Sequence, residues 1–334
     1  MSKKLRYRQC LPFAFIAFTF GCTGCTNTNN LLSTSSTTNL NSAEPNKLTE
    51  VVATTTVLCD FIKQIAQQTI NLTCLIPPNI DPHRYQPKLE DSQAINQARI
   101  IFYNGYNLEP NLFKLIKESK NRAAKIAVAQ RAVPKPLKYR KNGQIVPEPH
   151  VWHDTKNGMK MVEVITYNLS QIFPEHAPFY KSNAEKINKE LTQLDTWIKS
   201  RIASIPLKNR QLVTSHTAMG YYAKAYNLSW INVLPTVKAK GEPTASQTKA
   251  LFQVIRQVKA PKIFVETTIN PSLLKNIPPQ LQVKVFRRQL LVDGLATAGS
   301  EADTYQKMMT ANTRTIVEGL GGTYLIFAPQ VLKN

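Results

Sequence analysis

The sequence predicts an α/β protein made of two lobes with mostly parallel sheets, joined by one long rigid helix. Short apolar segments alternate with stretches of helical periodicity, as expected for parallel strands connected by helices. The alternation occurs twice, on either side of one exceptionally regular helical segment. With 334 residues, 43% of them hydrophobic, the chain is long enough for about two domains, each with its own core.

The first set of elements lies between residues 48 and 103, and strands and helices alternate in it. Strands are expected at Leu48–Thr54, Leu72–Ile76 and Arg99–Tyr103, with helices at Asp60–Gln68 and Glu90–Gln97. The second set contains expected strands at Gln211–Thr214, Lys262–Glu266 and Leu290–Asp293, and a helix over about Asp303–Leu320.

The linking helix is predicted over residues 178–204. Its apolar residues recur at steps of three or four, which defines one buried face: Tyr180, Ala184, Ile187, Leu191, Leu194, Ile198 and Ile202. At 1.5 Å per residue it would be about 40 Å long, enough to run along both lobes. We therefore expect an N-terminal lobe at 48–177 and a C-terminal lobe at 205–334.

Residues 1–25 are expected to be an export signal. Lys3, Lys4, Arg6 and Arg8 precede an apolar run, Leu11–Phe20, that is shorter than the about 20 residues of a spanning helix. The small residues before Cys25 resemble the lipobox of bacterial lipoproteins, so Cys25 is the expected lipid anchor. Cys22 occupies a position where a lipobox has a branched apolar residue, which leaves cleavage without lipidation open. Residues 26–47, rich in Ser, Thr and Asn, are expected to be a flexible polar tether.

The composition excludes several classes of protein. A formal charge of +21 suggests anionic partners, but the sequence has no zinc-finger spacing, RNP motif or run of five basic residues, so no nucleic-acid partner is expected. Cys59 and Cys74 could pair in an oxidising compartment or could be two buried small residues. Because the chain after residue 25 has no Cys-x-x-Cys motif, neither a thiolate metal site nor a dithiol redox centre is supported there.

The five histidines are the main candidates for chemistry. His83 and His216 each follow an expected strand, the position where ligands bind in open α/β sheets. His150 lies between a proline-rich segment and an expected helix, and Asp303 lies at the start of the last helix. Taken alone, Asp303 could simply be an acid favoured by the helix dipole, and each His could have a surface role.

Together these four residues suit a metal ion. Three imidazoles and a carboxylate match Zn²⁺ and similar ions, and four protein ligands make a closed site. Catalytic zinc usually keeps one position for water, and no His-Glu-x-x-His motif is present. The sequence thus favours capture of a metal over catalysis, with a metal-dependent hydrolase or a surface adhesin with an incidental metal site as alternatives.

Residues 48–324 resemble the metal-binding lipoproteins of zinc and manganese ABC importers, the cluster A-I solute-binding proteins. The resemblance rests on the order and spacing of several segments: "VVATTTVLCD" (51–60), "DPHRYQP" (81–87), "YNGYNLEP" (103–110), "EPHVWHD" (148–154), "VTSHTAMGYYAKAY" (213–226), "IFVET" (263–267) and "ADTYQKMMTANTRTIVEGL" (302–320). It implies metal ligands at His83, His150, His216 and Asp303, two lobes joined by one helix, and delivery to an ABC permease. It leaves His153 as a neighbour of the site and His176 as a solvated surface residue.

The resemblance also bears on the metal. The family's manganese-binding members generally have Glu where this chain has His216, so a third imidazole favours Zn²⁺, with Mn²⁺ next. The His-rich acidic loop of many zinc-binding members is replaced here by basic residues, Lys135, Lys138, Arg140 and Lys141, which weakens that assignment. Because imidazole must be neutral to bind, we expect affinity to fall as pH drops through about 6.5.

Overall fold

The computed structural model describes residues 48–141, 143–232, 249, 253, 255–257, 262–268 and 284–330. The expected export signal at 1–25, Cys25 and the tether at 26–47 lie outside the described residues. The described residues belong to one compact unit. In the part of the chain that is described, no helix is both long and apolar enough to cross a membrane.

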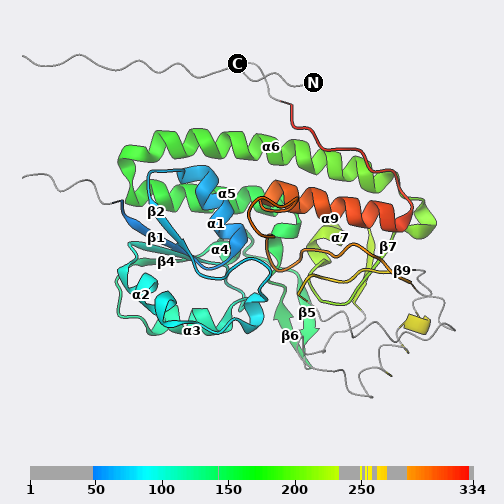
Figure 1. Ribbon diagram of the computed structural model, residues 1–334, viewed down its shortest axis with the longest axis horizontal. Coiled ribbons are helices and arrows are strands. Elements are labelled where there is room, and N and C mark those ends of the chain that lie inside the picture. The colour runs from blue at the N-terminus through cyan, green and yellow to red at the C-terminus, as the bar shows by residue number, and fades with distance from the viewer. Residues whose placement is uncertain are drawn as a thin grey trace, which may run out of the picture. The chain divides into compact units, whose positions relative to one another are not determined.

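The first sheet is parallel, with strand order β2-β1-β3-β4. Its strands are short, and helices connect them (Figure 1). The elements of this half are β1 (Glu50–Ala53), α1 (Thr56–Ala66), β2 (Asn71–Cys74), η1 (Pro82–Arg84), α2 (Leu89–Gln97), β3 (Ile100–Tyr103), α3 (Pro110–Glu118), β4 (Ala124–Ala127) and α4 (Val128–Ala132). Thr55 caps α1 by accepting a hydrogen bond from the backbone N–H of Leu58.

Side-chain alternation along β1 and β3 gives this sheet two apolar faces. Val51, Ala53, Ile100 and Phe102 pack in the main core, together with α1. Val52 and Ile101 point to the opposite face and form a smaller core with residues of α2 and α3. The sheet is therefore covered by helices on both sides, which is why its central strands β1 and β3 are apolar on both faces.

The second sheet is built from parallel pairs, β7 (Gln211–Thr214) with β8 (Ser229–Asn232) and β9 (Lys262–Ile263) with β10 (Lys284–Val285). A bridge from Thr214 to Phe264 joins the pairs, and a second bridge joins Glu266 to Leu290. The strand expected at Leu290–Asp293 is thus limited to one bridge at Leu290, and residues 291–293 follow it without a strand assignment. Helix α7 (Gly220–Ala225) packs beside β8, and the helix that begins at Tyr305 contacts β7.

Long helices unite the two halves. The predicted linking helix is present as α6 (Ala177–Ala203), and all seven residues of its apolar stripe are buried. It packs against α1, α5 (Thr155–Ile172) and α9 (Tyr305–Leu320), and lies alongside α5 and α9 in Figure 1. One core cluster continues from the first sheet through these helices to Leu212, Phe264 and Leu290. The fold is therefore α/β, with mostly parallel sheets and one long helix packed along both lobes.

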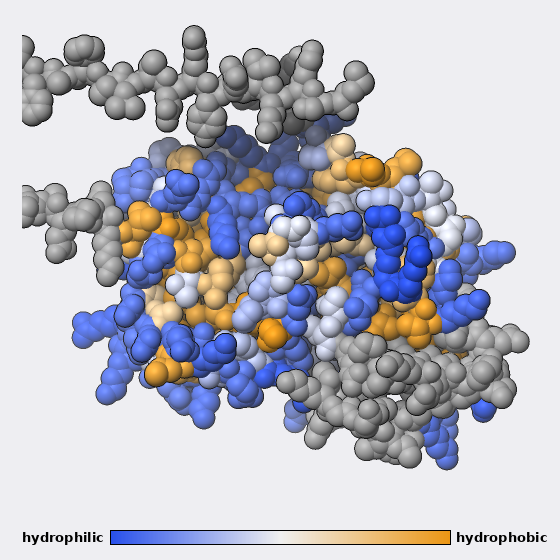
Figure 2. Space-filling model, in the orientation of Figure 1, coloured by the Kyte–Doolittle hydropathy of each residue, from blue (hydrophilic) through white to orange (hydrophobic). Residues whose placement is uncertain are grey.

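Several elements were not predicted. The basic segment around Lys138 and Arg140 forms an antiparallel hairpin of β5 (Lys138–Lys141) and β6 (Gln144–Pro147). Short 3₁₀ turns, η2 (Val151–His153), η3 (Pro174–His176) and η4 (Leu207–Asn209), precede α5, α6 and β7. On the face shown in Figure 2, hydrophilic residues cover most of the described surface, and smaller apolar patches lie between them.

Candidate metal centre

His83 is held on η1, in the loop that follows β2. Asp81 caps this turn, and its carboxylate accepts a hydrogen bond of 2.9 Å from the backbone N–H of His83. Pro82 at the first position of the turn fixes the backbone beside the ligand. The His83 side chain is 18% exposed, and its Nε2 lies 3.2 Å from Nε2 of His150.

His150 is buried and oriented by Glu148. One oxygen of the Glu148 carboxylate accepts a hydrogen bond of 3.1 Å from the backbone N–H of His150 and a second one from its ring Nδ1. This contact places the proton on Nδ1 and turns the Nε2 lone pair towards the site. Burial opposes protonation of the ring, but Glu148 and Asp293 outweigh it and raise the pKa of His150 to about 9.

His216 follows the end of β7, and Glu266 holds its backbone. One Glu266 oxygen accepts a hydrogen bond of 2.9 Å from the backbone N–H of His216, and the other accepts one from the Ser215 hydroxyl. Burial raises the pKa of Glu266 to about 7. The His216 side chain is 28% exposed, so this ligand is the most accessible of the cluster.

Asp293 is the carboxylate that the structure brings to the three histidines. Its Oδ1 lies 3.2 Å from Nε2 of His150, 3.7 Å from Nε2 of His216 and 3.8 Å from Nε2 of His83. Its Oδ2 accepts a hydrogen bond of 2.5 Å from the Thr268 hydroxyl. Burial alone would raise the pKa of Asp293, but the surrounding imidazoles outweigh it and lower that pKa far below its usual range.

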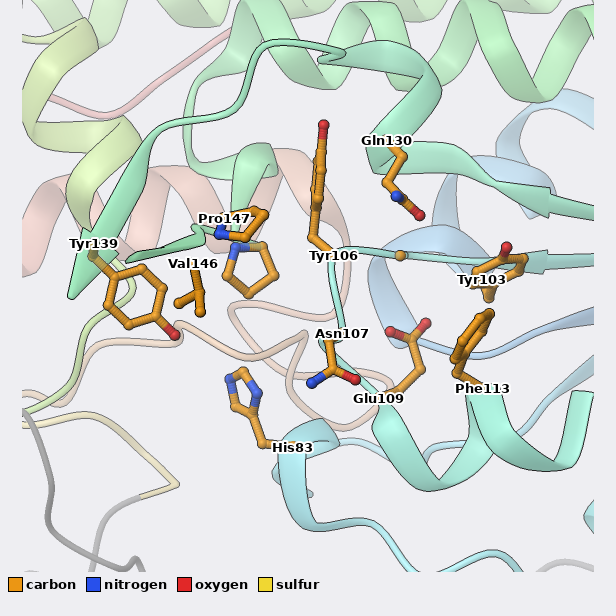
Figure 3. Close-up of a pocket in the computed structure, with 12 residues that line it drawn as sticks. His83, Tyr103, Tyr106, Asn107, Glu109, Phe113, Gln130, Tyr139, Val146 and Pro147 are labelled. Carbon is orange, nitrogen blue, oxygen red and sulfur yellow. The ribbon is translucent and has the colours of Figure 1, made fainter. Parts of the chain in front are cut away.

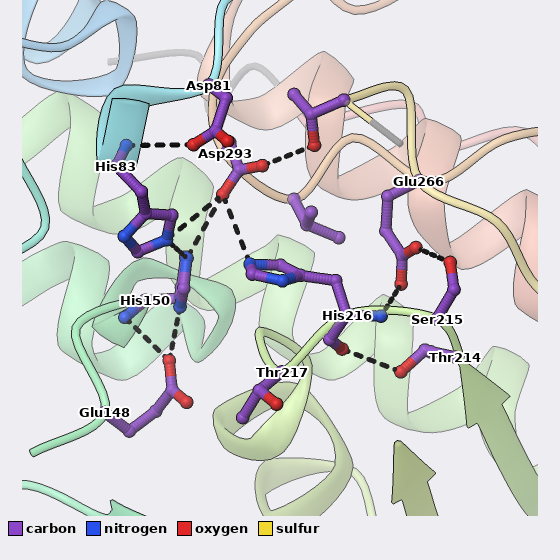
Figure 4. A network of polar contacts seen from close by, with 12 residues as sticks. Asp81, His83, Glu148, His150, Thr214, Ser215, His216, Thr217, Glu266 and Asp293 are labelled. Atoms are coloured by element: carbon purple, nitrogen blue, oxygen red, sulfur yellow. Dashed lines mark hydrogen bonds and ion pairs between the residues drawn. The ribbon is translucent and has the colours of Figure 1, made fainter. Parts of the chain in front are cut away.

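The four side chains converge on one point, as Figure 4 shows. One potential ligand atom from each of His83, His150, His216 and Asp293 lies within 4.8 Å of all the others. A tetrahedral ion with ligand distances near 2.0–2.1 Å keeps its ligand atoms about 3.3 Å apart. Four of the six separations among these atoms are 3.2–3.8 Å, close to that value, and all six lie within 4.8 Å, so small side-chain movements would bring the donor set around such an ion.

The structure corrects the prediction for Asp303. This residue precedes Thr304, the N-cap of α9, and its carboxylate accepts hydrogen bonds of 2.8 Å from the backbone N–H of Gly299 and from Nζ of Lys307. The Lys307 contact, with that of Gly299, lowers the pKa of Asp303. Asp303 therefore corresponds to the alternative given above, a carboxylate that the helix dipole favours near the start of a helix. The signal for Asp293 was present in the sequence, since it ends the expected strand Leu290–Asp293 as His83 and His216 follow theirs.

The remaining histidines lie outside the ligand cluster. His153 is completely buried, and its Nε2 donates a hydrogen bond of 2.9 Å to the carbonyl oxygen of Val292, next to Asp293. His176 lies at the surface on η3, with its Nε2 3.8 Å from a carboxylate oxygen of Glu175. Cys59 and Cys74 form a disulfide between α1 and β2, which settles the choice that the sequence left open.

A cavity of about 400 Å³ lies beside His83 (Figure 3). His83 forms part of its wall, and most of the rest comes from the loop after β3 and from the β5–β6 hairpin. The buried carboxylate of Glu109 lies on this wall, where it accepts hydrogen bonds from Thr54 and Asn104. Burial raises the pKa of Glu109 to about 7.

Comparisons with known proteins found a matching family and several relatives. The family model described as zinc-uptake complex component A periplasmic matches residues 51–319. The chain is 32% identical over 277 residues to the manganese ABC transporter substrate-binding lipoprotein PsaA of Streptococcus mitis, covering 81% of this chain and 89% of that protein. It is 31% identical over 324 residues to the metal ABC transporter substrate-binding lipoprotein ScbA of Streptococcus cristatus, covering 95% and 99%.

A solved structure supports the same assignment. The periplasmic zinc-binding protein TroA of Treponema pallidum superposes with a TM-score of 0.74 at 28% identity, covering 81% of this chain and 98% of TroA. The family consists of substrate-binding transport proteins, so the chain is not an enzyme and the hydrolase alternative is excluded. The chain belongs to the zinc-uptake complex component A family, the periplasmic metal-binding proteins of ABC importers.

Proposed function

We propose that this protein captures a divalent transition metal through His83, His150, His216 and Asp293 and delivers it to an ABC permease. The observation that carries the proposal is the convergence of four ligand atoms, three imidazole nitrogens and one carboxylate oxygen, within 4.8 Å of one another. With four protein ligands, a tetrahedral ion has no position left for a reactive water, which suits transport rather than catalysis.

Zn²⁺ is the metal we favour, with Mn²⁺ next. Three imidazoles and a single carboxylate make a borderline donor set that suits Zn²⁺ better than the harder Mn²⁺. The relatives differ in the metal that their names give: PsaA is named a manganese transporter lipoprotein and TroA a zinc-binding protein. The two ions must therefore be tested in competition.

The proposal includes export and anchoring. A signal at residues 1–25, a lipid on Cys25 and a tether at 26–47 would hold the metal-binding unit outside the cytoplasm, near its permease. Replacing Cys25 with Ala is expected to release the protein from the membrane fraction and to abolish incorporation of labelled fatty acid. Continued membrane association of the Cys25→Ala protein would overturn the anchor.

The decisive experiment is metal competition on metal-free protein spanning residues 26–334. Zn²⁺ and Mn²⁺ are presented together in equal amounts, and the bound metal is counted by native mass spectrometry. We expect one ion per chain, mostly Zn²⁺, and loss of that ion in His216→Ala. His176→Ala serves as the matched control, because His176 is a surface histidine outside the cluster. Equal retention of metal by both variants would refute the assigned site, and a preference for Mn²⁺ would refute the choice of metal.

A further inference from the structure

The segment that carries Asp293 is attached to the first half of the chain on both sides of the ligand. On one side, Nε2 of His153 on η2 donates a hydrogen bond of 2.9 Å to the carbonyl oxygen of Val292. On the other side, the Thr56 hydroxyl at the start of α1 accepts one of 2.8 Å from the backbone N–H of Leu295. Asp293 lies between these two contacts, although its own segment continues from the second sheet.

The contact with His153 is specific to one form of the ring. Burial lowers the pKa of His153 to about 3, so the ring is neutral and carries a single N–H. The carbonyl of Val292 requires that this proton be on Nε2. The buried Nδ1 then has no hydrogen-bond partner among the described residues, which is unfavourable. An apolar side chain would avoid this cost but would leave the Val292 carbonyl without its donor.

The contact with Thr56 depends on a close approach of the backbone. A Cβ atom added to Gly294 would lie 2.5 Å from Oγ1 of Thr56, so only glycine allows the segment to lie against α1 in this way. Helix α1 follows directly from β1, and η2 begins with Val151, the residue after His150. Both contacts therefore attach the Asp293 segment to the half of the chain that supplies His83 and His150.

We infer that His153 and Thr56 are positioning residues that together hold Asp293 at the metal. Neither side chain belongs to the ligand cluster, and each acts through the backbone next to Asp293. In this arrangement Asp293 keeps its place relative to His83 and His150, and release of the metal requires that one or both contacts open. The inference rests on the proposed function, since it assigns a role at the same site.

The test is the rate at which Zn²⁺ leaves the protein spanning residues 26–334, measured by transfer to excess chelator. His153→Leu and Thr56→Val remove one contact each with little change in volume. Because a net hydrogen bond contributes roughly 0.5–1.5 kcal/mol, each is expected to speed dissociation about three- to tenfold, and the double variant more. His153→Gln and Thr56→Ser keep a donor and an acceptor at these positions and are expected to restore a rate near that of the wild type.

A matched control separates positioning from general stability. Tyr180→Phe removes a buried hydroxyl that lies 2.8 Å from the Thr69 hydroxyl, away from the Asp293 segment. It should lower the melting temperature of the metal-free protein without changing the dissociation rate. The absorption spectrum of bound Co²⁺ provides a second readout, and it should change in His153→Leu and Thr56→Val but not in Tyr180→Phe.

The outcomes distinguish the two proposals. A wild-type protein that binds Zn²⁺ together with variants whose dissociation rate and Co²⁺ spectrum equal the wild type would overturn the positioning role alone. The positioning role would also be overturned if Tyr180→Phe accelerated Zn²⁺ release as much as His153→Leu and Thr56→Val do. A wild-type protein that binds neither Zn²⁺ nor Co²⁺ would overturn the proposed function and this inference with it.

Discussion

Glu148 accepts hydrogen bonds from both the backbone N–H and the ring Nδ1 of His150, two residues further along the chain. The intervening Pro149 fixes the backbone between them, and both side chains are buried. Glu148 thus orients the ring of His150 and, together with Asp293, raises its pKa to about 9. The pair gives the metal site a pH dependence different from that of an ordinary imidazole.

Metal affinity is expected to fall as the pH decreases from about 9, and not only near 6.5 as the sequence suggested. Below its pKa, His150 binds a proton that the metal must displace, so the dissociation constant should rise about tenfold per pH unit from this residue alone. The measurement is the dissociation constant for Zn²⁺ between pH 7 and 9, corrected for hydrolysis and buffer binding of the metal.

A variant of Glu148 isolates this effect. Glu148→Gln removes one of the two carboxylates that raise the pKa of His150, so the decline should begin at a lower pH, and the less well oriented ring should weaken binding about 10- to 100-fold. His176→Gln should leave the pH curve unchanged. An affinity that does not vary between pH 7 and 9 in the wild type would contradict this account of His150.

Asp293 and Asp303 form a natural matched pair for identifying the fourth ligand. Asp293→Asn removes the charge among the three imidazoles, and the loss of affinity is expected to exceed the about 10- to 100-fold typical of residues that only support ligands. Asp303→Asn should bind metal like the wild type, because Asp303 contacts Gly299 and Lys307 and is not part of the cluster. Calorimetric titration of both variants measures this difference, and the reverse order of effects would restore Asp303 as the ligand.

Glu109 should make the metal-free protein less stable as the pH rises. Its pKa is about 7 in the folded protein and 4.5 when exposed, so the folded state binds more protons between these values. The free energy of unfolding should therefore fall as the pH rises from about 4.5 to 7, by on the order of 2–3 kcal/mol from this group.

Substituting Gln at this position tests the sign. Glu109→Gln keeps an oxygen for the hydrogen bonds from Thr54 and Asn104 but cannot ionise. It should therefore be more stable than the wild type at pH 8 and similar to it at pH 4.5. Denaturant unfolding at the two pH values measures the difference, with the exposed Glu118→Gln as control. The assigned sign would be wrong if the free energy of unfolding of Glu109→Gln, compared with that of the wild type at the same pH, were lower at pH 8 than at pH 4.5.

The disulfide between Cys59 and Cys74 should contribute measurably to stability. The two residues are 15 positions apart, and closing a loop of that size stabilises a fold by about 3 kcal/mol in the chain-entropy model. Replacing both with Ala should lower the free energy of unfolding by about 2–4 kcal/mol. Reductant should weaken the wild type to a similar extent but leave the double variant unchanged, and an equal response of both proteins would argue against the bond.

Much of the architecture could be predicted from the sequence. The stripe from Tyr180 to Ile202 gave the bounds of α6 to within one residue, because its period records which face is buried. The strand at Gln211–Thr214 has the predicted bounds, and α9 begins two residues after the predicted start because Thr304 provides the cap. The β5–β6 hairpin was not predicted, since its exposed basic residues lack an apolar pattern.

The sequence by itself determined that this chain folds into α/β lobes around a long helix, and it predicted that His83, His150 and His216 belong to one ligand site. Those properties depend on local periodicity and on the ends of strands, which neighbouring residues encode. Only the tertiary structure decided between Asp293 and Asp303, which are ten positions apart and both acidic. The choice depends on which carboxylate the packing of η2 and α1 brings to the histidines, and the position of Asp293 at the end of an expected strand does not by itself reveal that long-range contact.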